Sequence, residues 1–558
     1  MVQVGVNGIP RRFQLDEDSR VRLPRKPAII ALDSGTSVVK AIAFDSAGTQ
    51  LAEAARPNVY AMLSDGGAEQ DMWRTWDDAG SVLQELVARL SLSHPDHEPA
   101  VLAVTAQGDG TWLVDAEGEP TGPGLLWLDA RAASIVDTLK ATGAAEAAFV
   151  HTGSGLAACQ QAPQLHWLAR HRPAMVAHAT HALHPKDYLY MRLTGVRATS
   201  PCEGSFTFGD FRTREYSDGV IQALDAEAFR RLLPPMIDGT NASHPLTARA
   251  AEHTGLPSGL PVVLGYVDVV CTTLGAGIYG GGADAGVTIV GSTGMHNRLV
   301  PDVAHVAPSP AMTGYCMAFP VPGHTVQAQS NMASTINIDW MVDFATEAAT
   351  LATGGSVSRN AVLDAINDGV AAARPGAIVY HPFISTAGER GPFTDSLARA
   401  AVIGLDQNVR LMDFARGIYE GLCFAARDCY VAVGGAPSEI RVTGGAARSH
   451  PLRAMLASCL GRPVLAAAHV EAGAAGVAMM AAVQAGLFAD MKDCAATWIA
   501  PHRGAPVPPD SRLAAQYDRL FPIYREAYQV MPTIWRHLHA AREGFSRDAN
   551  QPEGHHGQ

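Results

Sequence analysis

Two apolar runs meet at a polar turn in residues 28–51, which read AIIALDSGTSVVKAIAFDSAGTQL. Asp33 ends the first run, and Gly35 and Thr36 follow it in the turn. A carboxylate at the end of a buried strand is costly unless it has a partner. Backbone N–H groups and hydroxyls of such a turn can approach phosphate oxygens, while the carboxylate attracts Mg²⁺, a cation that prefers oxygen ligands. Taken alone, the turn is as consistent with a capped hairpin as with a phosphate site.

Three further segments place small or polar residues after predicted strands. VTGGAARS, residues 442–449, ends a strand in paired glycines, which either bring the backbone close to a nucleotide or form an ordinary turn. In LGYVDVV, Asp268 lies near a strand end, where it is either a functional carboxylate or a helix cap. In TAQGDGTWLVD, Gln107 and Asp109 follow the strand VLAVT. These segments decide how the first turn is interpreted.

Two charged pairs are expected to have structural roles. LLWLDAR contains Trp127, and its Asp129 and Arg131 are predicted to form an ion pair that fixes a loop. PKDYLYMRLTG places Lys186 and Asp187 at a helix start, where structural support is the favoured interpretation.

Composition argues against several classes of protein. The 558 residues carry a net charge of −12, whereas a nucleic-acid-binding protein would have a basic surface. Eight cysteines are scattered without a CxxC pair, which indicates reduced thiols in a cytoplasmic protein. No apolar run approaches the roughly 20 residues that span a bilayer, and residues 1–27 lack the apolar core of a secretory signal. The P-loop, zinc-protease and hydrolase motifs are absent, and the GxGxxG at 275–280 is interpreted as an interlobe hinge.

Short β-branched runs alternate with helix-length amphipathic stretches from residue 28 onward, which predicts an α/β fold. The segment AGVTIVGSTGMH, residues 285–296, echoes the first turn, because an apolar strand again runs into small residues. The echo predicts two related lobes that meet in the glycine-rich stretch 275–286. The predicted domains are an N-terminal extension (1–27), a first lobe (28–277), a second lobe (278–545) and a disordered tail (546–558).

Two predictions concern individual helices. DDAGSVLQELVARL is an amphipathic helix that Asp77 or Asp78 would cap. The C-terminal segment RLAAQYDRLFPIYREAYQVMPTIWRHL has an aromatic stripe at helical spacing, which predicts packing into the core rather than a ligand site.

Taken in order, these segments resemble the FGGY carbohydrate kinases, the family that includes glycerol kinase and xylulokinase. The matches extend from about residue 28 to residue 540 and comprise ALDSGTSVVK, AEQDMW, VTAQGDGTWLVDAEGEPTGPGLLWLDARA, KDYLYMRLTG, LGYVDVVCTTLGAG, TIVGST, PFISTAGERGPF, DFARGIYEGLCFAARD and VTGGAARSHPLRAMLAS. The resemblance implies two ribonuclease-H-like lobes of the actin and sugar-kinase superfamily, with ATP, Mg²⁺ and a small polyol or sugar in the interlobe cleft. It implies neither nucleic acid nor a membrane as partner, and it leaves a homo-oligomer open.

The resemblance also implies roles for individual residues. Asp268 corresponds to the family's catalytic base, and Asp33 would position Mg²⁺, directly or through water. Contacts to ATP are expected from three turns, which contain Gly35, Thr36, Ser37 and Lys40; Gly291, Ser292 and Thr293; and Gly444, Gly445, Ala446 and Ser449. Contacts to the acceptor are expected from Gln107, Gly108, Asp109, Trp127, Gln160 and Asp268. Phosphoryl transfer needs mainly positioning and charge neutralisation, with a carboxylate that takes the proton of the alcohol.

The acceptor side departs from the best-known members of the family. Glycerol kinases have an Arg-Glu pair, and xylulokinases a Met-His pair, where this sequence has Gly108-Asp109. Trp127 can supply an apolar floor for a carbon chain, while Asp109 can accept a hydrogen bond from a hydroxyl. The AQGDG and LWLDARA segments are most similar to those of erythritol kinases and less similar to those of L-xylulose kinases. The resemblance therefore implies phosphorylation of a terminal hydroxyl of erythritol, with L-xylulose, xylulose or another pentose or polyol as the alternative.

Two functions of other classes are compatible with the same fold. One is a catalytically silent sugar sensor, against which the retained Asp33 and Asp268 argue. The other is a chaperone-like or filament-like ATPase, against which the acceptor-side motifs and the GERGPF segment argue.

Overall fold

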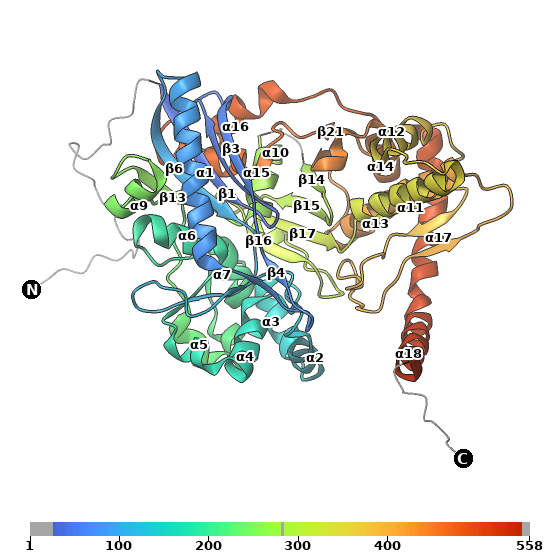
Figure 1. Cartoon of the computed structure of the whole chain (residues 1–558), viewed down its shortest axis with the longest axis horizontal. Coiled ribbons are helices and arrows are strands. Elements are labelled where there is room, and N and C mark those ends of the chain that lie inside the picture. Colours follow the sequence, from blue (N-terminus) through green and yellow to red (C-terminus); the bar gives the residue numbers. More distant parts are fainter. Residues whose placement is uncertain (1–25, 281–283, 550–558) are drawn as a thin grey trace, which may run out of the picture.

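A computed structural model describes residues 26–280 and 284–549, and Figure 1 shows a body with one sheet in each half. Each of these two sheets has six strands. The sheets mix parallel and antiparallel pairs, and helices cover them, which confirms the predicted α/β class. None of the described helices is long and apolar enough to cross a membrane.

The first sheet has the strand order β12-β13-β6-β1-β2-β3. Its strands are β1 (Pro27–Ser34), β2 (Val38–Phe44), β3 (Gln50–Pro57), β6 (Glu98–Ala106), β12 (His244–Pro245) and β13 (Pro261–Leu264). β1 and β2 form an antiparallel hairpin in which Asp33 is paired with Lys40. β6 runs parallel to β1, and β13 runs parallel to β6. The carboxyl ends of the three strands therefore share one edge, and Asp33, Gln107 and Asp268 all lie at that edge.

The second sheet has the order β16-β17-β15-β14-β20-β21. Its strands are β14 (Ala285–Val290), β15 (Gly294–Val300), β16 (Tyr315–Ala318), β17 (Thr325–Asn331), β20 (Glu439–Thr443) and β21 (Val464–Ala466). β14 pairs with β15 as an antiparallel hairpin and with β20 in parallel, which repeats the arrangement of β1, β2 and β6. The echo between residues 28–51 and 285–296 is therefore a repeated hairpin.

Smaller sheets of two or three strands complete the two lobes. They are formed by β4 (Ala61–Met62), β5 (Ala68–Gln70) and β8 (Gly124–Leu125); β7 (Trp112–Val114) and β9 (His181–Leu183); β10 (Gly209–Asp210) and β11 (Glu215–Tyr216); and β18 (Val379–His381) and β19 (Ala401–Ile403).

The helices fall into two groups along the chain. Those before residue 280 are α1 (Met72–Ser93), α2 (Ala133–Ala141), α3 (Ala144–Thr152), α4 (Gln161–His171), α5 (Pro173–His178), α6 (Pro185–Thr194), α7 (Pro201–Phe208), α8 (Asp218–Ala223), α9 (Ala248–Thr254) and α10 (Asp268–Ala276). Those after it are α11 (Thr335–Thr353), α12 (Arg359–Gly369), α13 (Leu411–Ala432), α14 (His450–Leu460), α15 (Ala472–Gln484), α16 (Met491–Trp498), α17 (Ser511–Gln529) and α18 (Met531–Ala549).

Helices α10 and α15 join the two lobes. α15 packs along α10 and also against β1 and β6 of the first sheet, although it follows the second sheet in sequence. One apolar core contains buried side chains from β1, β14 and both helices. Burial of this shared core fixes the edge of the first sheet against the second lobe, which is where the predicted site residues lie.

Helices α17 and α18 pack on the second lobe. Tyr517, Phe521, Tyr524 and Tyr528 of α17 and Trp535 of α18 are buried in its core. The prediction that the aromatic stripe belongs to the core is confirmed.

The structure corrects three boundaries. α1 begins at Met72, and the side chain of Asp71 caps it by accepting from the N–H groups of the second and third residues that follow, so neither Asp77 nor Asp78 is the cap. Pro27 already belongs to β1, so the predicted extension 1–27 ends one residue too late. α18 continues to Ala549, so the predicted disordered tail 546–558 begins inside a helix. Residues 1–25 and 550–558 lie outside the described residues.

Candidate active site between the two lobes

Asp33 is a half-buried carboxylate at the carboxyl end of β1. Within residues 26–280 and 284–549 its side chain has no hydrogen-bond or ion-pair partner. Burial raises its pKa to about 6, with Lys40 opposing this shift and Glu471 adding to it. Gly473, in the first turn of α15, lies so close that a Cβ there would be 2.6 Å from Oδ2 of Asp33. A carboxylate held in this way without a partner fits a role as a cation ligand.

Asp268 is the first residue of α10 and follows β13. Its Oδ1 accepts a hydrogen bond from the backbone N–H of Val269 at 2.7 Å. Burial is the main cause that raises its pKa to about 8, and the nearby charge of Asp33 raises it further. A carboxylate with a pKa near neutrality is suited to accept a proton from an alcohol.

Lys40 connects the hairpin of the first lobe to the start of α15. Its ammonium forms an ion pair with Glu471 at 2.6 Å, and both side chains are about one-third exposed (33% and 27%). Ser37, in the turn before Lys40, is exposed, and Gly35 closes the turn by donating to the carbonyl of Val38 at 3.0 Å. The hairpin therefore presents a cation and a hydroxyl beside the two carboxylates.

Thr36 faces the acceptor-side residues. Its hydroxyl donates to Oε1 of Gln107 at 2.9 Å and accepts from Nε1 of Trp127 at 2.8 Å. Gln107 in turn donates to Oε1 of Gln70 at 3.1 Å. These bonds tie the hairpin of β1 and β2 to the predicted acceptor side.

Asp109 follows β6 and adopts a positive φ of 53°. Its Oδ2 accepts from the hydroxyl of Tyr315 at 3.1 Å and from the thiol of Cys159 at 3.6 Å. Burial raises the pKa of Asp109, while Arg390 is the largest of several groups that oppose this shift. Gly108 precedes Asp109 and lies against Val267, because a Cβ at this position would be 2.5 Å from Cγ2 of that valine.

Trp127 lies beside the same group of residues. The guanidinium of Arg390 is 5.5 Å from the centre of its ring. Arg390 also donates from Nε to the hydroxyl of Ser330 at 2.9 Å. The second lobe therefore supplies a cation next to both Trp127 and Asp109.

Gln160 is engaged within its own loop. Its side chain accepts from the N–H of Ala157 at 3.2 Å and donates to the carbonyl of Gly155 at 3.1 Å. From this loop it is the neighbouring Cys159 that contacts Asp109. The predicted role of Gln160 as an acceptor contact gains no support from these bonds.

The predicted nucleotide turns lie together on the second sheet. Gly291 and Thr293 close the turn after β14 with a backbone bond of 3.1 Å, and Ser292 is exposed. Gly444 follows the adjacent strand β20 with φ of 92°, and a Cβ there would be 2.6 Å from the carbonyl oxygen of Val290. Both turns thus lie at the carboxyl ends of neighbouring parallel strands.

The rest of the glycine-rich turn leads into a helix. Gly445 and Ala446 belong to the short 3-10 helix Gly445–Arg448, and Gly445 is exposed. Ser449 caps α14 by accepting from the N–H of Leu452, and it donates to Asn367 at 3.2 Å. The exposed part of the turn is therefore Gly444-Gly445, the paired glycines identified in the sequence.

Both predicted charged pairs have structural partners. Asp129 and Arg131 form an ion pair at 2.6 Å. Lys186 is fully buried between Asp187, at 2.5 Å, and Glu203. His184, Asp187 and Glu203 are close enough to hold a metal ion, but the ammonium of Lys186 already neutralises these carboxylates.

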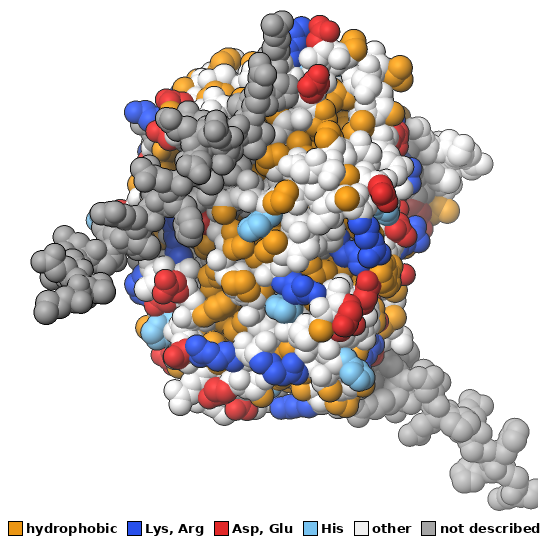
Figure 2. Space-filling model, turned by 90° about the vertical axis from the view of Figure 1, so that its left-hand side faces the viewer, with side chains coloured by type: hydrophobic (Ala, Val, Ile, Leu, Met, Phe, Trp, Pro, Cys, Tyr) orange, Lys and Arg blue, Asp and Glu red, His pale blue; other side chains and the backbone are white. Residues whose placement is uncertain are grey.

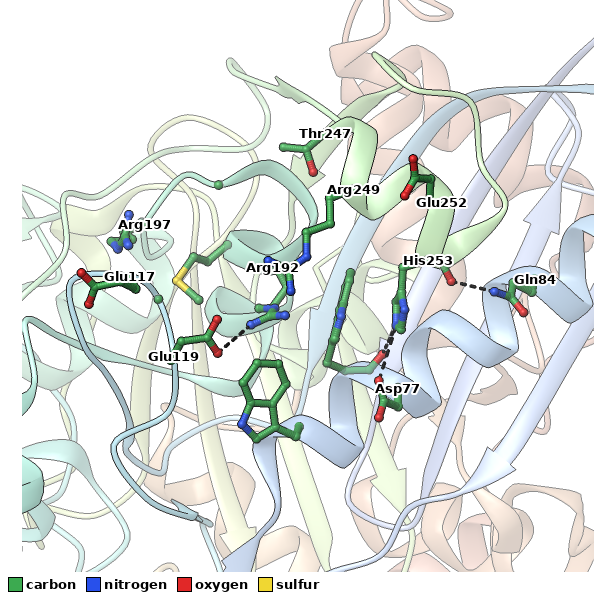
Figure 3. Close-up of a pocket in the computed structure, with 15 residues that line it drawn as sticks. Asp77, Gln84, Glu117, Glu119, Arg192, Arg197, Thr247, Arg249, Glu252 and His253 are labelled. Atoms are coloured by element: carbon green, nitrogen blue, oxygen red, sulfur yellow. Dashed lines mark hydrogen bonds and ion pairs between the residues drawn. The ribbon is translucent and has the colours of Figure 1, made fainter.

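A separate surface pocket of about 700 Å³ lies between α1, α6 and α9. Figure 3 shows Arg192 and Arg249 directed into it, and Arg192 stacks on Trp73 with 4.5 Å between the guanidinium carbon and the ring centre. None of the predicted site residues lines it. Figure 2 shows basic and acidic side chains interspersed on one side of the molecule. The pocket therefore lies apart from the candidate active site.

Sequence reasoning missed Tyr315, Arg390 and Glu471. Arg390 lies in the GERGPF segment, which carried part of the resemblance, so a signal for it was present. Tyr315 and Glu471 belong to no recognised motif, and they reach the site only because the two lobes pack together.

Fold and site together define a two-lobed α/β protein that carries two carboxylates at the end of its first sheet and glycine-containing turns at the ends of β14 and β20 in its second. The sequence models of the FGGY family of carbohydrate kinases match residues 28–275 (N-terminal domain) and 287–485 (C-terminal domain), so the chain belongs to this family. It is a carbohydrate kinase that transfers a phosphoryl group to an alcohol acceptor, and kinases of this family use ATP.

Known proteins are similar over most of the chain. Erythritol kinase of Brucella abortus (strain 2308) is 48% identical over 511 residues, which are 91% of this chain and 97% of that protein. Xylulose kinase of Escherichia coli (strain K12) is 28% identical over 437 residues, 78% of this chain and 85% of that protein. The crystal structure of xylulose kinase from Rhodospirillum rubrum superposes with a TM-score of 0.79 at 26% identity and covers 91% of this chain and 100% of that one.

Proposed function

We propose that this kinase phosphorylates a terminal hydroxyl of erythritol, with Mg²⁺-bound ATP as the donor. The observation that carries the proposal is the 48% identity to erythritol kinase of Brucella abortus over 97% of that protein. The chemistry of the predicted acceptor side supports it, because Asp109 can accept a hydrogen bond from a polyol hydroxyl and Trp127 can supply an apolar surface. Gln107 and Gly108 are proposed as further contacts to the acceptor.

Asp268 is proposed as the general base. The carboxylate takes the proton of the terminal hydroxyl as the oxygen attacks the γ-phosphorus, while the bond between that phosphorus and the β,γ-bridging oxygen breaks. Its raised pKa, about 8, gives it the affinity for a proton that this step requires. A base of this kind accelerates a reaction by roughly 10²- to 10⁴-fold.

Asp33 is proposed to hold Mg²⁺, directly or through water. The fit rests on its carboxylate, which lacks a partner among the described residues and has a pKa raised by burial. A bound divalent cation supplies positive charge that neutralises the phosphate oxygens. A cation held at Asp33 would also favour the ionised form of Asp268, the form that can accept a proton.

The turns of both lobes are proposed to hold the nucleotide. Lys40 would exchange its ion pair with Glu471 for the phosphates, because a phosphate presents more charge than one carboxylate. On the first lobe, Gly35, Thr36 and Ser37 are proposed beside the phosphates. On the second lobe, the proposed contacts are Gly291, Ser292, Thr293, Gly444, Gly445, Ala446 and Ser449.

A coupled assay of ADP formation with five acceptors tests the proposed function. The acceptors are erythritol, glycerol, xylitol, L-xylulose and D-xylulose, each at several concentrations with Mg²⁺ and ATP. The proposal expects the highest kcat/KM for erythritol. A higher value for L-xylulose or D-xylulose would replace erythritol by a pentose. A lack of activity with all five acceptors would favour a silent sensor. ADP formation at the same rate with and without an acceptor would favour an ATPase.

A further inference from the structure

One side chain of the second lobe reaches into the acceptor side of the first. Tyr315 is the first residue of β16, an edge strand of the second sheet. Its hydroxyl donates a hydrogen bond to Oδ2 of Asp109, 3.1 Å away and 206 positions earlier in the chain. The contact therefore exists only while the two lobes are packed together.

The position of Tyr315 is fixed by its neighbours. The next residue, Cys316, donates from its backbone N–H to the hydroxyl of Ser154 in the first lobe at 3.0 Å. The ring of Tyr315 packs edge-on against Phe206 of α7, with 5.6 Å between ring centres. Ring and backbone thus hold the tyrosine in place independently of its hydroxyl, so the hydroxyl can be removed without removing the packing.

The hydroxyl orients the carboxylate of Asp109. Tyr315 and Cys159 both donate to Oδ2. Oδ1 has no hydrogen-bond partner in the part of the chain that the structure describes. Arg390, also from the second lobe, supplies a nearby positive charge that favours the ionised form of Asp109. One oxygen of Asp109 is therefore held by the protein, and the other is left for a donor such as a polyol hydroxyl.

We propose that Tyr315 is a positioning residue that sets acceptor specificity by holding Asp109 for a hydroxyl of the polyol. The proposal rests on the proposed function, since it assigns Asp109 to the acceptor site. A hydroxyl on the second, third or fourth carbon of the chain donates to Oδ1 while Tyr315 keeps Oδ2 occupied. Because the tyrosine belongs to the second lobe, the acceptor site is complete only when the lobes are packed, so polyol binding and lobe packing favour each other.

Substitution Tyr315→Phe removes the hydroxyl and keeps the ring against Phe206. The matched control is Tyr380→Phe, because Tyr380 is a buried tyrosine whose hydroxyl donates to Asn337 at 2.8 Å within the second lobe. For wild type and both variants, kcat and KM are measured for erythritol, glycerol and ATP. Calorimetric titration with erythritol in the absence of nucleotide provides a second readout, and thermal unfolding reports whether each variant is folded.

The expected result is a rise in the KM for erythritol of about tenfold in Tyr315→Phe, because a hydrogen bond to a charged group is lost. The KM for ATP and kcat stay within about twofold of wild type, and the preference for erythritol over glycerol becomes smaller. Calorimetry should show the same weakening of erythritol binding. Tyr380→Phe should match wild type in all these constants.

The proposal is overturned if Tyr315→Phe keeps the wild-type KM for erythritol, or if the KM values for erythritol and ATP rise together. If Tyr315→Phe does not fold, the variant Asp109→Asn, which keeps Tyr315, is measured in its place. Unchanged erythritol binding in Asp109→Asn would overturn the proposal as well. Failure of the proposed function can be distinguished from failure of this proposal. If wild type prefers another of the five acceptors, the KM values of wild type and both variants are compared for that acceptor. A wild type active on none of them overturns both.

Discussion

In the absence of Mg²⁺ and nucleotide, the charge of the Asp33 carboxylate should destabilise the folded protein. Its carboxyl pKa rises from an ordinary 3.8 to about 6 in the folded state. A raised carboxyl pKa means that the folded state holds its proton more tightly than the unfolded state does. The stabilising contribution of the protonated Asp33 carboxyl is therefore lost gradually as the pH rises above 3.8, and it is fully lost above about pH 6.

The size of this effect follows from the shift. Each pKa unit corresponds to about 1.4 kcal/mol, so the charge of Asp33 costs about 3 kcal/mol at pH 8 and about half of that at pH 5. The substitution Asp33→Asn removes the charge and keeps the shape of the side chain. It also removes a charge that raises the pKa of Asp268, which adds stability in the same direction.

Thermal unfolding of wild type and Asp33→Asn in metal-free buffer at pH 5 and pH 8 measures the effect. The variant should be the more stable protein at pH 8, and its advantage should shrink toward pH 5. Mg²⁺ with ATP should stabilise wild type more than the variant, because the variant has lost the carboxylate proposed to hold the cation. The reasoning is refuted if the variant is no more stable than wild type at pH 8, or if its advantage is the same at both pH values.

Three further substitutions test separate parts of the site. Lys40→Met should raise the KM for ATP by about tenfold in steady-state assays and leave the KM for erythritol within about twofold, since the lost cation faces the phosphates; an unchanged KM for ATP would contradict this. Gly444→Ala should lower the melting temperature and weaken ATP binding, because a positive φ combined with an extended ψ costs a Cβ-bearing residue about 1–3 kcal/mol and the added Cβ meets Val290; calorimetry with ATP checks this, and wild-type affinity would count against it. Asp109→Asn should lower kcat/KM for erythritol by about 10- to 100-fold at an unchanged KM for ATP; equal losses for both substrates would contradict its assignment to the acceptor.

The sequence predicted the parts of the site that depend on local order. Asp33 stands in a strand–turn–strand pattern, and Asp268 follows a short apolar run, so both could be assigned to strand ends before the fold was known. The repeated hairpin was visible for the same reason, because the second copy has the same succession of residue types as the first.

Contacts that depend on how the lobes pack could not be read in this way. Glu471 meets Lys40 across 431 positions, and Tyr315 meets Asp109 across 206. No short motif carries such information, since it arises from the burial of α10 and α15 between the sheets. Side-chain direction within a loop was equally hidden: Gln160 bonds to its own loop, and its neighbour contacts Asp109.

The boundary errors have simple causes. The helix α1 begins at Met72, five residues before Asp77, because Met72 and Trp76 already pack into the core. At the other end, α18 continues through residues whose polar composition resembles that of a tail.

Asp268 is proposed to accept the proton as ATP phosphorylates a terminal hydroxyl of erythritol. This role is tested most directly by measuring erythritol phosphate formation by ³¹P NMR with wild type and Asp268→Asn, with ATP binding followed by calorimetry. Wild type should form erythritol phosphate, and the variant should bind ATP normally but turn over at least about 100-fold more slowly. Near-wild-type turnover by Asp268→Asn, or ADP formed by wild type at the same rate without erythritol, would contradict it.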